Sequence, residues 1–131
     1  MQLNGAVIYY IEVKSRWAPK DSVLMSASQF RTSVEEKGHY ALCEVDMIDY
    51  DKTNVEKHEY PNISETIDRI LAVTNIGVLN EALKDSLNQD SDQVHVGGDY
   101  KVIVPQAVWK EHGIQFNELV QEIKKKVEEK L

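Results

Sequence analysis

The stretch Tyr9-Tyr10-Ile11-Glu12-Val13-Lys14 decides the fold of this chain. It overlaps an apolar run from Ala6 to Val13 that is rich in β-branched and aromatic residues, as is typical of a buried strand. Because alternate side chains of a strand share a face, we expect Glu12 and Lys14 to point the same way. A carboxylate and an ammonium group side by side on a strand indicate either a metal site or a salt bridge.

The composition is that of one globular domain. The chain has 131 residues, of which 42% are hydrophobic and 28% are charged, so it is long enough to bury a core. No apolar run approaches the roughly 20 residues that span a bilayer, and the N-terminus lacks a signal peptide. We therefore expect a cytoplasmic protein with no membrane partner. The single cysteine, Cys43, excludes an internal disulfide.

The net charge of −7 bears on nucleic-acid binding. Proteins that grip phosphates without sequence preference usually carry a basic face, so this charge argues against broad non-specific binding. It leaves room for a local basic groove, because charge can be distributed unevenly over a surface.

The pair Asn4-Gly5 is a strong signal for a β-hairpin turn. Only Met1 to Leu3 precede it, too few for a full partner strand. The sequence leaves two interpretations: those residues are a stub, or the chain is a fragment of a longer polypeptide whose preceding strand is absent.

The remaining N-terminal elements follow from local signals. Ser26 and Gln29 match a helix capping box, and Gly38 lies where the helix should end. Glu44 and Asp46 mark one face of the following strand as partly wet. The elements expected in order are a strand ending at Lys14, a loop over 15–21, a strand over 23–25, a helix from Ser26 and a strand over 40–48.

The C-terminal half is expected to be mostly helical. Ser64 is a good N-cap, and Gly77 is expected to interrupt the helix that it starts. Gly97-Gly98 predicts a two-residue hairpin turn. The expected elements are a connecting loop over 49–62, a helix with Ile67, Ile70 and Leu71 on its apolar face, a second helix with Leu79, Ala82, Leu83 and Leu87, the hairpin over 94–104, a short helix between Pro105 and Gly113, and a last helix from about Asn117.

The strand Tyr10-Ile11-Glu12-Val13-Lys14-Ser15-Arg16 resembles the Glu-x-Lys strand of PD-(D/E)XK nuclease-like folds. The residues that follow it sharpen the likeness: they are Leu24-Met25-Ser26, Gln29-Phe30, Tyr40-Ala41-Leu42 and Val45. In this spacing the chain is similar to the NO VEIN C-terminal-like domain, a family of unknown function often found at the end of large ATPase-like or helicase-like proteins. The resemblance covers about residues 4–48.

The resemblance implies metal-assisted hydrolysis of a phosphodiester, with Glu12 as a ligand of Mg²⁺ and Lys14 as the lysine that positions or deprotonates the attacking water. Nucleic acid would then lie near Arg16, Gln29 and Arg31. Simpler roles are an exposed ion pair for Glu12 and Lys14, a helix cap for Gln29, and solvated charges for the two arginines. No Asp or Glu precedes Glu12, so the first metal-binding acid of the pattern is absent.

We therefore expect an α+β fold with a small mixed sheet that is centred on residues 9–14 and flanked by helices. A nuclease-like half-core of strand, strand, helix and strand is expected first. Two helices, a hairpin and a C-terminal helix are expected to follow it. The chain is expected to be one domain, 1–131, from the C-terminal part of a larger protein, with a half-core over 4–48 and a C-terminal part of helices and a hairpin over 63–131.

Three functions are compatible with the sequence. The first is a nuclease-like module that contacts nucleic acid beside an ATPase-like parent region and is not catalytic by itself, since the first acid is absent. The second is a non-enzymatic interaction domain. The third is a structural domain that forms homo-oligomers through an exposed strand edge.

Overall fold

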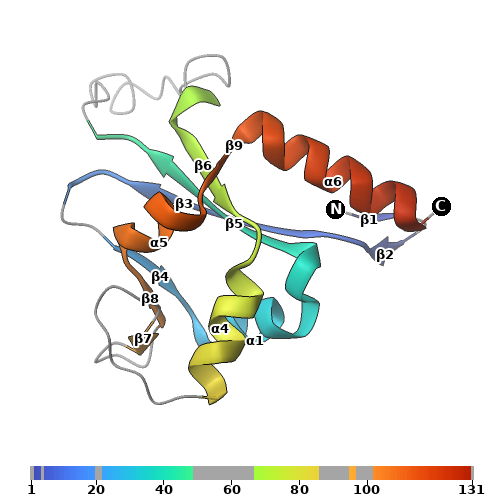
Figure 1. Ribbon diagram of the computed structural model, residues 1–131, viewed down its shortest axis with the longest axis horizontal. Coiled ribbons are helices and arrows are strands. Elements are labelled where there is room, and N and C mark those ends of the chain that lie inside the picture. Colours follow the sequence, from blue (N-terminus) through green and yellow to red (C-terminus); the bar gives the residue numbers. More distant parts are fainter. Residues whose placement is uncertain are drawn as a thin grey trace.

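The computed structural model describes residues 2–3, 5–19, 22–48, 67–85, 95–96 and 102–130. In these residues the chain forms an α+β fold with four α-helices and a mixed four-stranded sheet flanked by helices (Figure 1). The expected fold class is confirmed. Within the same residues, no helix is long and apolar enough to cross a membrane.

The main sheet has the strand order β3-β5-β6-β9. Its strands are β3 (Tyr10–Arg16), β5 (Tyr40–Asp46), β6 (Ile70–Val73) and β9 (Ile114–Gln115). β3 and β5 run parallel, whereas β5 with β6 and β6 with β9 are antiparallel. This order makes β5 an inner strand and leaves β3 at an edge.

The expectation that residues 9–14 form the buried centre of the sheet is wrong. Ile11 and Val13 are 43% and 58% exposed, whereas Ala41 and Leu42 of β5 are fully buried. The apolar run of β3 suits a central strand, but an apolar run by itself does not show how many neighbours a strand has. Pairing on one side only places β3 at the edge.

The connection from β3 to β5 has the expected order of strand, helix and strand. β3 is followed by β4 (Val23–Met25) and by α1 (Ala27–Glu36), after which a 3₁₀ turn, η1 (Lys37–His39), leads into β5. The capping box is confirmed. Ser26 Oγ accepts a hydrogen bond from the Gln29 amide at 3.2 Å, and Gln29 Oε1 accepts one from the Ser26 amide at 2.9 Å.

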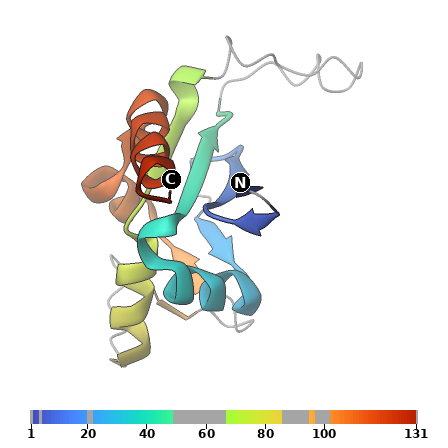
Figure 2. The same ribbon diagram turned by 90° about the vertical axis from the view of Figure 1, so that its right-hand side faces the viewer.

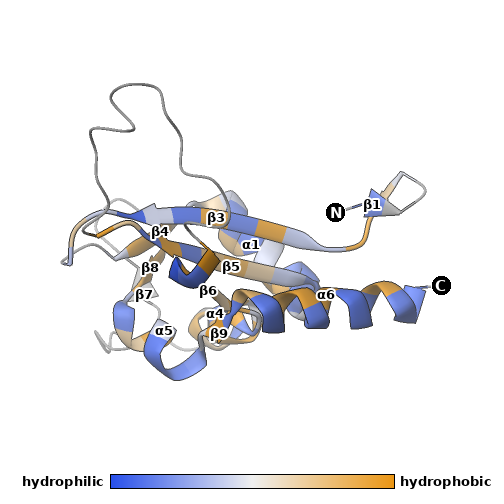
Figure 3. Ribbon diagram, turned by 90° about the horizontal axis from the view of Figure 1, so that it is seen from above, coloured by the Kyte–Doolittle hydropathy of each residue, from blue (hydrophilic) through white to orange (hydrophobic). Residues whose placement is uncertain are grey.

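A short hairpin precedes the main sheet, in agreement with the turn predicted at Asn4-Gly5. β1 (Gln2–Leu3) pairs with β2 (Ala6–Val7), and Gly5 has the positive φ of 80° that such a turn needs. The hairpin projects past the end of the sheet, near the end of α6 (Figure 3).

The helix predicted from Ser64 is wrong where the structure describes it. Residues 67–69 form a 3₁₀ turn, η2 (Ile67–Arg69), and residues 70–73 form strand β6. Ile70 packs on the side of α6 and Leu71 on the other side, so both faces of β6 are covered. Apolar residues at 67, 70 and 71 fit a helical period, but pairing with β5 and β9 decides the outcome.

Two details of the C-terminal half also differ from expectation. Gly77 does not interrupt a helix but lies inside α4 (Ile76–Asp85). The second sheet has the strand order β4-β8-β7, in which β7 is His95–Val96 and β8 is Val102–Val104. Val96 pairs with Val102, whereas the predicted two-residue turn would pair Val96 with Asp99. Val102 and Val104 of β8 are buried in the core. Leu87, predicted in the second helix, lies outside the described residues.

The last two helices are as predicted. α5 (Gln106–His112) begins after Pro105 and ends at Gly113, and α6 covers Phe116–Lys130.

Two apolar cores flank the main sheet. α6 covers one face through Leu119 and Ile123, which pack with Tyr9, Ala41, Cys43 and Ala72. The other face is covered by α1, α4, α5 and the small sheet, with the buried residues Val23, Met25, Tyr40, Leu42, Val73, Ile76, Val102, Val104, Val108 and Trp109. Figure 2 shows α6 on one side of β5 and the N-terminal hairpin on the other.

Candidate functional site

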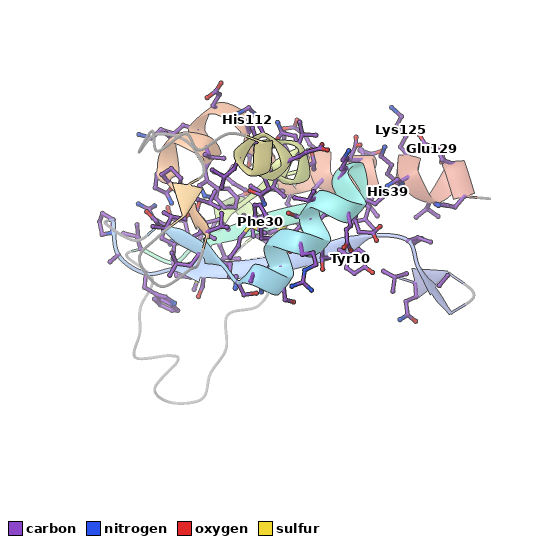
Figure 4. The ribbon with its side chains drawn as sticks, turned by 90° about the horizontal axis from the view of Figure 1, so that it is seen from below. Tyr10, Phe30, His39, His112, Lys125 and Glu129 are labelled. Carbon is purple, nitrogen blue, oxygen red and sulfur yellow. The ribbon has the colours of Figure 1, made fainter. Side chains whose placement is uncertain are left out.

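The predicted site residues of β3 lie on the face that α1 covers, and the others lie on α1 itself. The parallel register pairs Tyr10 with Tyr40 and Lys14 with Glu44 on β5. Because side chains alternate along a strand, Tyr10, Glu12 and Lys14 project to the same side. In the view of Figure 4, α1 lies in front of β3 and Tyr10 lies beside the helix.

Glu12 and Lys14 form an ion pair, as the sequence allowed. Lys14 Nζ lies 3.4 Å from Glu12 Oε1, and the two side chains are 31% and 29% exposed. Ion pairs this accessible to water contribute about 0–1 kcal/mol. The pair therefore adds little to stability, and both groups stay within reach of a ligand.

A small pocket lies between β3 and α1. Its volume is about 140 Å³, and Glu12 and Gln29 both line it. The other lining residues are Tyr10, Ile11, Ser28, Thr32 and Tyr40. The structure thus brings two of the predicted site residues together. Gln29 Oε1 is held by the capping box, whereas its Nε2 amide group is not part of that cap.

The two tyrosines of the pocket were not predicted as site residues. Their rings stack with centroids 6.2 Å apart. Burial raises the pKa of the Tyr40 phenol to about 12, and the negative charge of Glu12 raises it further. Tyr40 therefore stays protonated at neutral pH and can donate a hydrogen bond. The spacing of Ser28, Gln29 and Thr32 on α1 is the sequence signal that could have indicated this wall of the pocket.

Arg16 and Arg31 are not brought to the pocket. The Arg16 side chain is 14% exposed, and its Nη2 donates a hydrogen bond to the Pro19 carbonyl at 2.6 Å. Its Nε lies 3.7 Å from Glu44 Oε1. Arg31 is exposed on α1 and does not line the pocket. Of the predicted residues, Glu12, Lys14 and Gln29 form the candidate site.

The face of β5 that was expected to be partly wet is exposed at Asp46, whose side chain is 48% exposed, but Glu44 on the same face is buried. It is 3% exposed and accepts a hydrogen bond from Gln106 Nε2 at 2.7 Å. Burial raises the pKa of the Glu44 carboxyl group; the charge of Asp46 acts in the same direction, while Gln106 and Arg16 act against it. α5 closes this face at Glu44 through Gln106, so the acidic residue at this position does not mark exposure.

The raised pKa of Glu44 predicts how stability depends on pH. The folded protein binds the proton of the Glu44 carboxyl group more tightly than the unfolded chain does. The stability that this proton binding contributes is fully present below the pKa of the unfolded chain, and it is lost as the pH rises through the pKa of the folded protein. We expect Glu44→Gln to remove that loss, so the free energy of unfolding of the variant rises relative to wild type as the pH increases above about 4, the usual pKa of Glu in an unfolded chain. Urea denaturation at a series of pH values measures this. An equal rise in Asp68→Asn, which removes an exposed carboxylate, would contradict the assignment.

The side chains of the pocket provide only some of the ligands that a metal ion needs. Among the described residues, no group of three or more His, Cys, Asp or Glu side chains is placed to hold a metal. Mg²⁺ is often held by one or two carboxylates together with water and substrate phosphates. Glu12 by itself is therefore a weak site, and a bound phosphate would have to complete it.

Fold and site together define an α+β protein with a mixed sheet and a polar pocket between its edge strand and the first helix. Comparison of the chain with protein-family models, with curated proteins and with solved structures finds no match.

Proposed function

We propose that this chain is a nuclease-like module of the PD-(D/E)XK type, which contacts nucleic acid at the Glu12 pocket and does not cleave it by itself. One observation carries the proposal. Glu12 and Lys14 lie side by side on β3, and the connection through β4 and α1 brings Gln29 to the same pocket. The resemblance to NO VEIN C-terminal-like domains would place such a module next to an ATPase-like or helicase-like region.

The pocket offers hydrogen-bond donors to a phosphate. Gln29 and the protonated Tyr40 line the pocket, and the Lys14 ammonium group lies 3.4 Å from Glu12 Oε1, which belongs to another lining residue. Charge-assisted hydrogen bonds from an ammonium group to phosphate oxygens are among the stronger polar contacts. Glu12 would repel the phosphate unless a divalent cation lay between them, which ties ligand binding to Mg²⁺.

The proposed lack of cleavage rests on the absence of a further carboxylate beside Glu12 among the described residues. On the same face the neighbouring strand β5 offers Glu44, opposite Lys14 in the register. Its carboxylate is buried and held by Gln106 and Arg16, so it does not join Glu12 as a ligand. A single available carboxylate is poorly suited to activate water on a metal.

A titration with Mg²⁺ or Mn²⁺, followed by NMR with and without a short DNA duplex, tests the proposal. We expect weak perturbation of the amides around Glu12 with metal alone and stronger perturbation when DNA is present, because phosphate oxygens complete the coordination. Glu12→Ala should abolish both responses. Glu35→Ala, which removes an exposed carboxylate from α1, should leave them unchanged.

Two results would count against this function. One is the absence of any perturbation at millimolar metal in the presence of DNA. The other is a response of the same size in Glu12→Ala, which would move the metal elsewhere. DNA cleavage that survives Glu12→Ala would identify a contaminating nuclease.

A non-enzymatic interaction domain is the second candidate function. The observation that favours it is the exposed edge of β3, where Ile11 and Val13 leave an apolar surface open.

A further inference from the structure

The outer edge of β3 offers backbone groups for pairing. β3 is the last strand in the sheet order, and in the described part of the chain no strand pairs with its outer side. The Met47 amide donates to the Arg16 carbonyl at 2.8 Å, so the backbone of Arg16 faces β5. Because this orientation alternates along a strand paired in parallel, the amides and carbonyls of Ile11, Val13 and Ser15 face outward. Edges of this kind are templates for another strand.

The side chains beside this edge are apolar on the face of α6. Ile11 and Val13 are 43% and 58% exposed. They line an apolar pocket of about 180 Å³ together with α6 residues that include Phe116 and Val120. Figure 3 shows β3 along the outside of the sheet, with α6 on the far side of β5. A strand added here would cover these side chains as well as pair the backbone.

We propose that the occupant is β3 of a second copy of this chain, antiparallel and centred on Val13. In this register Glu12 of each copy lies opposite Lys14 of the other. These are the non-hydrogen-bonded positions, where facing side chains approach most closely. Val13 lies opposite Val13, and Ile11 lies opposite Ser15, which places the outward backbone groups of both strands in hydrogen-bonded pairs.

Charge selects this register among those with the same backbone pairing. A pair centred on Glu12 would place two carboxylates opposite each other, and one centred on Lys14 would do the same with two ammonium groups. Like charges directly opposite are destabilising, and opposite charges are stabilising. In the register centred on Val13, the ion pair seen within one strand, at 3.4 Å, becomes a network of four alternating charges.

Charge reversal tests the register directly. Glu12→Lys and Lys14→Glu should each weaken self-association by about 10- to 30-fold, because two attractive pairs become repulsive. The double variant Glu12→Lys/Lys14→Glu restores the opposite charges and should dimerise like wild type. A mixture of the two single variants should form a heterodimer, since every facing pair is then of opposite sign. Sedimentation equilibrium from micromolar to millimolar protein compares the two single variants, the double variant and the mixture with wild type.

Amide exchange supplies a second readout. At concentrations where the dimer forms, the amides of Ile11, Val13 and Ser15 should gain protection. Those of Glu12 and Lys14 already face β5 and should change little, which makes them internal controls. Heterodimer formation on mixing also shows that both single variants are folded.

Three outcomes would overturn the inference. They are a wild type that stays monomeric throughout the range, a dimer that the single reversals leave unchanged, and a dimer in which the three outward amides gain no protection. The last two would place the contact on another surface. The inference does not rest on the nucleic-acid function, because self-association is measured without metal or DNA and a failed metal titration would leave the dimer unaffected.

Discussion

Gly77→Ala is expected to lower the free energy of unfolding by about 3 kcal/mol or more. Gly77 lies in α4 where this helix crosses α1, and a Cβ atom added there would come within 2.2 Å of the Ser33 carbonyl oxygen and 2.8 Å of the Lys37 Cα atom. Both are backbone atoms, so a side-chain rotation cannot relieve the overlap. The two helices would have to move apart.

Separation of α1 and α4 would also disturb a buried polar contact. Asn80, one turn after Gly77, is fully buried and donates a hydrogen bond from Nδ2 to Ser33 Oγ at 2.8 Å. A buried amide that loses its partner costs about 1–3 kcal/mol. The effect of Gly77→Ala therefore exceeds the intrinsic preference of a helix for alanine, about 1 kcal/mol in the opposite direction.

Gly38→Ala is the matched control for this prediction. The added Cβ would meet only the end of the flexible Lys126 side chain, at 3.5 Å from Nζ, so little change in stability is expected. Urea denaturation of both variants gives the comparison. Similar free energies of unfolding for the two alanine variants would show that α1 and α4 are not in such close contact.

Leu42→Ala is expected to cost about 3 kcal/mol, within the range of roughly 2–5 for a buried leucine. Leu42 is fully buried in β5, which has a paired strand on each side, and the missing methyl groups would leave a cavity in the core. Such a loss is a large part of the 5–15 kcal/mol that stabilises an ordinary domain.

Ile11→Ala removes the same number of carbon atoms from the edge strand and serves as the comparison. Ile11 is 43% exposed, so we expect a loss of only about 1 kcal/mol. The midpoints and slopes of denaturation curves separate the two effects. If Ile11→Ala proved as costly as Leu42→Ala, β3 would be a central strand and the edge-pairing inference would lose its basis.

The candidate site was predictable in part. Glu12 and Lys14 could be placed on one face because the period of a strand is local, and Gln29 could be placed on the helix because a capping box spans only four residues. That Glu12 and Gln29 line one pocket depends on how α1 packs on β3. The same packing adds Tyr40, whose importance at the site no local pattern indicates.

By itself, the sequence determined the elements that short-range chemistry specifies. These are the hairpin at Gly5, the capped helix α1, the short helix between Pro105 and Gly113, and the last helix. Each depends on residues within one or two turns of each other, so the signal is complete in a short window of sequence.

Only the tertiary structure decided which strand is central, that residues 70–73 form a strand, and that Glu44 is buried. Each outcome depends on pairing between segments far apart in the chain, as when Cys43 of β5 pairs with Ala72 of β6. Apolar periodicity indicates that a side chain is to be buried, but the element that buries it comes from elsewhere in the sequence. The strand around Glu12 therefore lies at an edge, where its charges and backbone remain open to a partner.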